Sequence, residues 1–217
     1  MLFLHAFGEG SARAGQPAPG SPVTGIVLAG GRSARLGQDK ALLRLDGGLT
    51  LVATTVERLR PLVDEVLVVT GDGARLGRLS ARVVPDVYPD AGALGGIYSG
   101  LVAARHEHAL TVACDMPFLS QDLLRHMLAL PRDYDVLLPR LADGLLEPLH
   151  AVYSRACREP IRERLAAGRY RVVGFHDLVR VRHVEEPELR RFDPELRSFF
   201  NVNTPEELRR ALEMLGE

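Results

Sequence analysis

The most constraining feature of the chain is an apolar stretch that runs into a glycine turn and then a basic loop, VTGIVLAGGRSARLGQDK, residues 23–40. Its first part is short, apolar and rich in β-branched residues, which predicts a buried parallel strand. Gly30 and Gly31 stop this strand and allow the backbone to approach a ligand closely. The loop beyond them carries cations that include Arg35 and Lys40. Backbone N–H groups and cations in this arrangement suit a phosphate-bearing ligand.

The spacing of this loop differs from two well-known phosphate-binding motifs. GxGxxG does not fit, because Gly30 and Gly31 are adjacent and the next glycine is Gly37. The GxxxxGKS or GxxxxGKT pattern does not fit either, because Gln38 and Asp39 follow Gly37. The alternative is an ordinary strand–helix turn that is rich in glycine for geometry alone, and it would leave the charged positions unexplained.

Lys40 stands out by its rarity. The chain has 27 Lys and Arg residues in total, and Lys40 is the only lysine. An ammonium is a compact point charge whereas a guanidinium is a planar fork, so the two are not equivalent at a tight phosphate site. The position of Lys40 directly after the glycine loop favours a phosphate contact over an incidental surface lysine.

Length and composition are those of an ordinary globular protein. A chain of 217 residues with 46% hydrophobic and 25% charged residues can bury one substantial core, which predicts a single domain. The formal net charge of -1 gives no support for a general nucleic-acid or membrane-surface role. Two cysteines are too few for a disulfide scaffold, and we expect both to be reduced thiols.

The first 22 residues differ from the rest of the chain. A brief apolar patch is followed by Gly, Ala, Pro and Ser, without the basic start and long apolar core of a secretory signal. We therefore expect a flexible extension at residues 1–22 and one domain at residues 23–217. No apolar run approaches the roughly 18 residues needed to cross a bilayer. Cytoplasm is the default expectation, with neither nucleic acid nor membrane as a partner.

Strand and helix patterns alternate through the first half of this domain. Further strands are expected at residues 65–70, 82–84 and 109–113, and helices after Thr50, from the glycine-rich loop 92–96 and after Ser120. This alternation predicts an α/β fold, a doubly wound and mostly parallel sheet with helices on both faces.

The second half has a less regular pattern. Strands are expected at residues 136–139 and 148–153, a helix within 155–167, and further short strands at 172–175 and 179–184. The C-terminal helix has a clear start, because Thr204 and Glu207 have the spacing of a capping box. We expect this helix to end near residue 215 and to bury Leu208, Leu212 and Leu215.

Each of the four expected strand ends in the first half carries a residue suited to ligand binding. The glycine pair follows the first strand, Thr70 ends the second, Asp86 follows the third and Asp115 follows the fourth. Doubly wound sheets bind ligands at the carboxyl ends of their strands. The spacing therefore predicts that these four segments surround one cleft.

Asp115 is the best candidate for a metal ligand. It closes an apolar strand, and Mg²⁺ needs only one or two carboxylates together with waters and substrate phosphates. Its alternative role is to cap the following helix. For Asp86 the sequence leaves three roles open, namely a second metal ligand, a nucleoside contact and a turn-forming residue.

Polar residues also gather near the end of the chain and at EPLH, residues 147–150. Asn201 and Asn203 alternate on an expected extended segment, so their side chains should point to one face. An amide there can contact a polar ligand without adding charge near a metal site. The alternative is that Asn203 only shapes the turn before the helix. For His150 a structural role is favoured over a catalytic one.

Between Thr24 and about Leu212 the chain resembles the molybdenum cofactor guanylyltransferases, which are nucleotidyltransferases of Rossmann-like fold. The resemblance rests on LAGGRSARLGQDK, VVPD followed by GALGGI, VACDMPFL, EPLHAVY and FFNVNTPEEL. One position departs from the pattern, because Thr70 stands where family members often carry Asn.

The resemblance implies transfer of GMP from GTP to the phosphate of molybdopterin or Mo-molybdopterin, with Mg²⁺ and release of pyrophosphate. It implies a nucleotide-binding half at about 23–130 and a second-substrate half at about 131–217. The implied catalytic residues are Lys40, Arg35 and Asp115, with Asp115 as the metal ligand. The implied nucleotide contacts are Leu28, Ala29, Gly30, Gly31, Lys40, Thr70, Asp86 and Asp115. The candidate contacts to the second substrate are Asn201, Asn203 and Gly95.

Two alternatives remain open. The first is a related nucleotidyltransferase that uses CTP or a sugar phosphate. That cytidylyltransferase branch usually resembles LAAG and DQP where this chain has LAGG and CDMP, which favours GTP. The second is a non-catalytic nucleotide-binding partner of a molybdoenzyme, against which the presence of Lys40 and Asp115 argues. Molybdoenzymes and other cofactor-biosynthesis proteins are further candidate partners.

Overall fold

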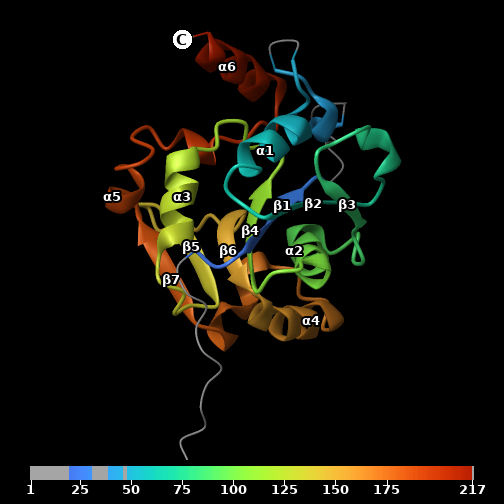
Figure 1. Cartoon of the computed structure of the whole chain (residues 1–217), viewed down its shortest axis with the longest axis vertical. Coiled ribbons are helices and arrows are strands. Elements are labelled where there is room, and N and C mark those ends of the chain that lie inside the picture. Colours follow the sequence, from blue (N-terminus) through green and yellow to red (C-terminus); the bar gives the residue numbers. More distant parts are fainter. Residues whose placement is uncertain (1–19, 31–38, 46–47, 217) are drawn as a thin grey trace, which may run out of the picture.

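The computed structural model describes residues 20–30, 39–45 and 48–216, and these residues form one seven-stranded sheet in the order β3-β2-β1-β4-β6-β5-β7 (Figure 1). Within the described part of the chain, β6 alone runs antiparallel to its neighbours. The strands are β1 (Val23–Leu28), β2 (Glu65–Thr70), β3 (Arg82–Pro85), β4 (His108–Ala113), β5 (Val136–Arg140), β6 (His150–Ser154) and β7 (Val181–Glu185).

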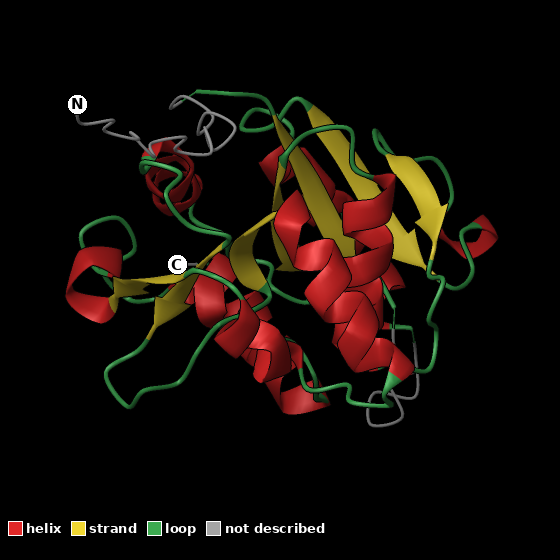
Figure 2. Ribbon diagram, turned by 90° about the horizontal axis from the view of Figure 1, so that it is seen from below, coloured by secondary structure: helices red, strands yellow, loops and turns green. Residues whose placement is uncertain are grey.

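Helices cover both faces of this sheet (Figure 2). The α-helices are α1 (Leu51–Leu59), α2 (Gly92–Ala103), α3 (Gln121–Ala129), α4 (Arg158–Ala166), α5 (Glu186–Leu189) and α6 (Pro205–Leu215). Short 3₁₀ helices lie between them, namely η1 (Lys40–Leu42), η2 (Ala74–Leu76), η3 (Arg155–Cys157), η4 (Val172–Leu178) and η5 (Arg197–Phe199). The predicted doubly wound, mostly parallel α/β fold is confirmed.

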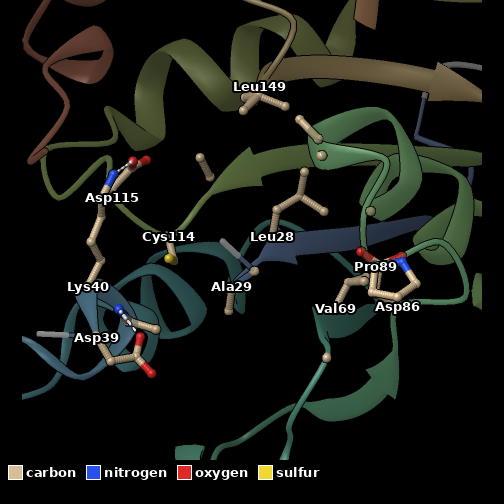
Figure 3. A pocket seen from close by; sticks show the side chains of 17 residues that line it. Leu28, Ala29, Asp39, Lys40, Val69, Asp86, Pro89, Cys114, Asp115 and Leu149 are labelled. Carbon is tan, nitrogen blue, oxygen red and sulfur yellow. Dashed lines mark hydrogen bonds and ion pairs between the residues drawn. The ribbon is translucent and has the colours of Figure 1, made fainter. Parts of the chain in front are cut away.

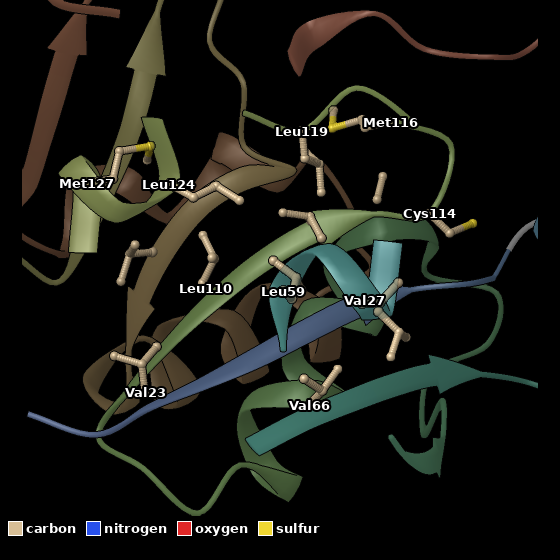
Figure 4. Packing of buried hydrophobic residues seen from close by; sticks show 14 of the residues in the cluster. Val23, Val27, Leu59, Val66, Leu110, Cys114, Met116, Leu119, Leu124 and Met127 are labelled. Atoms are coloured by element: carbon tan, nitrogen blue, oxygen red, sulfur yellow. The ribbon is translucent and has the colours of Figure 1, made fainter. Parts of the chain in front are cut away.

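The core is divided by the sheet into two layers, because successive side chains of a strand point to opposite faces. Val27 of β1 packs with α1, α3 and α5 on one face, and Figure 4 shows Leu59 of α1 and Leu124 and Met127 of α3 against the strands. Ile26 and Leu28 of β1 pack with α2 and α4 on the other face. The first strand is therefore buried on both sides, as its continuous apolar run predicts.

Close approach of α2 to β1 depends on a glycine. A Cβ atom on Gly100 would lie 2.6 Å from Cγ2 of Ile26. Because a carbon contact needs about 3.5 Å or more, only glycine allows this helix to lie so near the strand. The helix brings its N-terminal residues, which include Gly92 and Gly96, to the end of β1.

Helices α1 and α6 are capped at their N-termini by the threonines that the sequence indicates. The hydroxyl of Thr50 accepts a hydrogen bond from the N–H of Ala53 at 3.3 Å. The hydroxyl of Thr204 accepts from the N–H of Glu207 at 3.2 Å, while the Glu207 carboxylate accepts from the N–H of Thr204 at 2.9 Å. The predicted capping box at the start of α6 is confirmed.

Two predictions about the second half are wrong. Residues 172–175 form part of the 3₁₀ helix η4 and not a strand, since the N–H of Gly174 bonds to the nearby carbonyl of Arg171. Leu212 and Leu215 of α6 are 42% and 40% exposed, and Leu208 is only partly buried. Helix α6 lies at the edge of the molecule and packs on a small cluster, so Ala211 is its one fully buried residue.

Both halves of the chain contribute strands to the same sheet, because β4 pairs with β6. The extension at residues 1–22 lies outside the described residues as far as residue 19. No helix in the described part of the chain combines the length and apolar character that a membrane span requires.

Candidate active site

A cavity of about 340 Å³ lies at the carboxyl ends of β1, β2 and β4, which is the edge predicted from the strand ends (Figure 3). Its walls come from the β1 end, the η1 segment, the β2 and β3 ends, the start of α2 and the β4 end. The lining residues with a candidate role are Leu28, Ala29, Gly30, Asp39, Lys40, Asp86, Gly92, Gly96 and Asp115.

The end of β1 is held by backbone hydrogen bonds on both sides. The N–H of Ala29 donates to the carbonyl of Val69 at 2.9 Å, and the carbonyl of Leu28 accepts from the N–H of Cys114 at 3.1 Å. Gly30 has open space where a Cβ atom would be. These contacts present the backbone of the β1 end to the cavity. Gly31 and Arg35, also expected at this site, lie outside the described residues.

Lys40 and Asp115 line the cavity, and Asn203, which does not line it, contacts Lys40. The ammonium Nζ of Lys40 lies 3.1 Å from Oδ2 of Asp115, and it also donates to Oδ1 of Asn203. The side chains of Lys40 and Asp115 are 23% and 18% exposed. In addition, the N–H of Val202 donates to the backbone carbonyl of Asp115 at 2.9 Å. The C-terminal segment therefore joins the end of β4 at the cavity.

Asp115 also has the features of a metal ligand. Its second oxygen, Oδ1, is buried and has no hydrogen-bond partner among the described residues. A buried acceptor without a donor is costly, and a cation would satisfy it. No group of three His, Cys, Asp or Glu side chains gathers as a closed metal cage within the described part of the chain. This donor set fits Mg²⁺, which takes most of its ligands from water and phosphate.

The neighbouring thiol does not contribute to such a site. Cys114 lines the cavity between Ala113 and Asp115, and burial raises the pKa of its thiol to about 12. The thiol is therefore neutral near neutral pH, and Mg²⁺ takes oxygen rather than sulfur ligands.

Asp86 has the turn-forming role that the sequence left open, and it also lines the cavity. Its Oδ1 accepts from the hydroxyl of Ser99 in α2 at 2.8 Å and from the N–H of Tyr88 at 3.0 Å. It therefore shapes the turn after β3 and fastens α2. Asp86 also lines the cavity, so a ligand can reach it.

Thr70 and Arg75 form a polar contact that connects two strand ends. Thr70 is buried, and its hydroxyl accepts from Nη2 of Arg75 at 3.1 Å. The same nitrogen donates to the carbonyl of Ala29 at 2.7 Å, and Nη1 forms an ion pair with Asp39. No sequence pattern indicates a role for Arg75, because it is one arginine among many and belongs to no motif. Thr70 itself does not line the cavity, although Val69 and Gly71 do.

The three candidate contacts to the second substrate lie in different places. Asn203 binds Lys40, as described above. The amide of Asn201 donates to the carbonyl of Phe199 at 3.1 Å, and Asn201 does not line the cavity. Gly95 is buried in α2, where a side chain would collide with the carbonyl of Tyr88. Its neighbour Gly96 lines the cavity instead.

His150 is a core residue, as favoured from the sequence. It is 0% exposed, and its ring packs edge-on against Phe199 with 5.0 Å between the ring centroids. Burial lowers its pKa to about 4, so the imidazole is neutral. Nearby in sequence, burial and then the charge of Asp143 raise the pKa of Glu147 to about 7. Neither residue lines the cavity.

Comparison with known proteins shows which family the chain belongs to. The family model of the MobA-like NTP transferase domain matches residues 25–182. The chain belongs to the MobA-like NTP transferase family. A protein named "Probable molybdenum cofactor guanylyltransferase" from Pelotomaculum thermopropionicum is 43% identical over 188 residues, which cover 87% of this chain and 91% of that protein.

Two further members of this family support the assignment. The "Molybdenum cofactor guanylyltransferase" of Desulfosudis oleivorans is 38% identical and covers 87% of this chain and 94% of its own length. The crystal structure of molybdopterin-guanine dinucleotide biosynthesis protein A from Archaeoglobus fulgidus has a TM-score of 0.77 and 28% identity. That match covers 89% of this chain and 98% of the other. The resemblance predicted from the five sequence motifs is confirmed.

Proposed function

We propose that this protein transfers GMP from GTP to the phosphate of molybdopterin or Mo-molybdopterin in a magnesium-dependent reaction that releases pyrophosphate. The observation that carries the proposal is that Lys40, which lines the cavity together with Asp115, contacts both Asp115 and Asn203. These contacts join a cation from the glycine loop, a carboxylate from a strand end and an amide from the C-terminal segment. The relatives from Pelotomaculum thermopropionicum and Desulfosudis oleivorans are named as molybdenum cofactor guanylyltransferases.

The charges explain why such a site accelerates the reaction. The attacking phosphate oxygen and the α-phosphate of GTP are both anionic and repel each other. Lys40, together with Arg35, would bind the triphosphate and stabilise the negative charge that develops on the leaving pyrophosphate. The backbone at Leu28, Ala29 and Gly30 would hold the nucleotide in line for attack. No protein nucleophile is needed.

Asp115 is the residue that would hold Mg²⁺, through the oxygen that has no partner among the described residues. When bound, the metal would neutralise part of the triphosphate charge. Lys40 would then exchange its contact with Asp115 Oδ2 for the phosphates. Asn203 would keep the ammonium in place during this exchange.

We assign one of the two substrates to each part of the chain. Residues of about 23–130 would bind GTP, with Asp86 as a nucleoside contact, and residues of about 131–217 would contribute to the second substrate. Asn201 from this second part and Gly95 from the first part remain proposed contacts to the second substrate. The setting would be the cytoplasm, because Cys114 and Cys157 are buried free thiols of the kind expected in a reducing compartment.

GTP is favoured over CTP by the sequence motifs LAGG and CDMP. It is favoured over ATP because the Watson–Crick edges of guanine and adenine differ in donors and acceptors. A pocket made of backbone groups leaves unpaired polar atoms against the wrong base, at about 1–3 kcal/mol for each mismatch.

The direct test is to incubate the protein with each of the four nucleoside triphosphates, Mg²⁺ and molybdopterin, and to identify the product by mass spectrometry. We expect a guanine dinucleotide and pyrophosphate with GTP alone. Lys40→Ala should abolish the product, whereas Arg78→Ala, which removes an exposed cation outside the cavity, should not. Equal kcat/KM values for GTP and ATP would reject guanylyl transfer.

A further inference from the structure

Asp39 poses an electrostatic problem at the nucleotide site. Its carboxylate lines the cavity beside Lys40, where the proposed function puts a triphosphate of several negative charges. An unpaired carboxylate at that position would repel the ligand. The residue nevertheless has a local purpose, because its Oδ1 accepts from the N–H of Ala41 at 3.1 Å and so caps the helix η1 that begins at Lys40.

Arg75 removes this conflict. Its Nη1 forms an ion pair with Oδ2 of Asp39, so the two carboxylate oxygens have separate partners. The guanidinium is held in place by three further acceptors, namely the carbonyl of Ala29 at 2.7 Å, the hydroxyl of Thr70 at 3.1 Å and the carbonyl of Asp72 at 3.1 Å. These acceptors hold the guanidinium beside Asp39, where its charge neutralises that of the carboxylate.

We infer that Arg75 is a positioning residue that neutralises Asp39 and thereby makes the Lys40 end of the cavity competent to bind a triphosphate. The inference rests on the proposed function only in taking a nucleoside triphosphate as the ligand. It assigns Arg75 no contact with the substrate. Arg75 acts through Asp39, and Lys40 remains the residue that meets the phosphates.

The inference predicts an order of affinities that a structural role cannot produce. Arg75→Gln leaves the Asp39 carboxylate unpaired, and we expect GTP and tripolyphosphate to bind about 10- to 100-fold more weakly. Asp39→Asn keeps an oxygen for the helix cap and leaves Arg75 with net positive charge, so binding should become tighter than in the parent. The double variant has neither charge and should bind within a few-fold of the parent.

Isothermal titration calorimetry with GTP and with tripolyphosphate, both with Mg²⁺, measures this order. Arg78→Gln is the matched control, since it removes the same charge from an exposed position in the same loop and should change the affinity little. Arg75→Lys retains the charge and should retain most of the affinity. The loss in Arg75→Gln should also shrink as the salt concentration rises.

Three results would overturn the inference. Parental affinity in Arg75→Gln would mean that Asp39 needs no neutralisation. A double variant as weak as Arg75→Gln would mean that Arg75 contacts the phosphates itself or only supports the fold. Equal losses in Arg75→Gln and Arg78→Gln would mean that net charge alone matters. Because these are binding measurements, they stand even where the parent binds GTP but forms no dinucleotide, a result that would reject the proposed function alone.

Discussion

Acidification should destabilise this fold in part through the buried imidazole of His150. The side chain is 0% exposed, and neither ring nitrogen has a hydrogen-bond partner among the described residues. Burial lowers its pKa to about 4, although the carboxylate of Asp193 opposes that shift. In the unfolded chain the same imidazole would titrate near its ordinary pKa of about 6.5.

The sign and size of the effect follow from these two values. Between about pH 6.5 and about pH 4 the unfolded chain binds a proton at His150 that the folded chain does not, so stability falls as the pH falls through this range. Between about pH 7 and about pH 5, His150 should lower the free energy of unfolding by about 2 kcal/mol. His108 is also buried and its pKa is also lowered to about 4, so it adds a loss of the same direction.

Urea unfolding of the parent, His150→Leu and His150→Gln at both pH values isolates the contribution of His150. Neither Leu nor Gln titrates, but Gln is polar and Leu is not. An effect shared by both variants therefore comes from the lost titration and not from a change in polarity. Between pH 7 and pH 5, the free energy of unfolding of both variants should fall by about 2 kcal/mol less than that of the parent. His108 contributes the same pH-dependent loss to all three proteins. The same pH-dependent loss in the parent and in both variants would refute a buried neutral imidazole at position 150.

Three further predictions concern the site and its scaffold. Asp115→Asn should lower turnover by about 100-fold or more and remove its stimulation by Mg²⁺; a parental magnesium titration would show that the metal binds elsewhere. Gly100→Ala should destabilise the fold by about 1–3 kcal/mol, because its Cβ would meet Ile26, and unchanged unfolding in urea would disprove that contact. Thr204→Ala should cost about 1 kcal/mol through the lost cap of α6, whereas Thr204→Ser should be nearly neutral in the same measurement.

The convergence of strand ends on one cavity could be predicted from the sequence because it follows from local signals. An apolar run predicts a strand, a glycine or aspartate marks its end, and parallel strands bring their carboxyl ends to one edge. Gly30, Asp86 and Asp115 indeed line the same cavity. Thr70 also lies at this edge, but its side chain turns into the protein, which a strand boundary alone does not determine.

The contacts made by loops could not be predicted in this way. The ion pair of Arg75 with Asp39 depends on the path of two turns, and nothing in the sequence near Arg75 specifies where its guanidinium reaches. The sequence predicts a strand at residues 172–175 where the structure has a 3₁₀ helix, because a short apolar run has no periodicity that distinguishes a strand from a helical turn. Leu212 and Leu215 follow the spacing of a buried helix face, but no element of the described chain covers that side of α6.

The position of Lys40 explains why this chain keeps one lysine among its arginines. Its ammonium lies between acceptors from two segments, Oδ2 of Asp115 and Oδ1 of Asn203, which lie far apart along the chain. An ammonium has three rotatable donors around a single point, so it can bind both acceptors and turn a donor to a phosphate when the contact with Asp115 is exchanged. A guanidinium is a larger planar group whose donors are spread over three nitrogens, so it cannot gather them around a single point. A tight point between two acceptors and a phosphate therefore selects lysine.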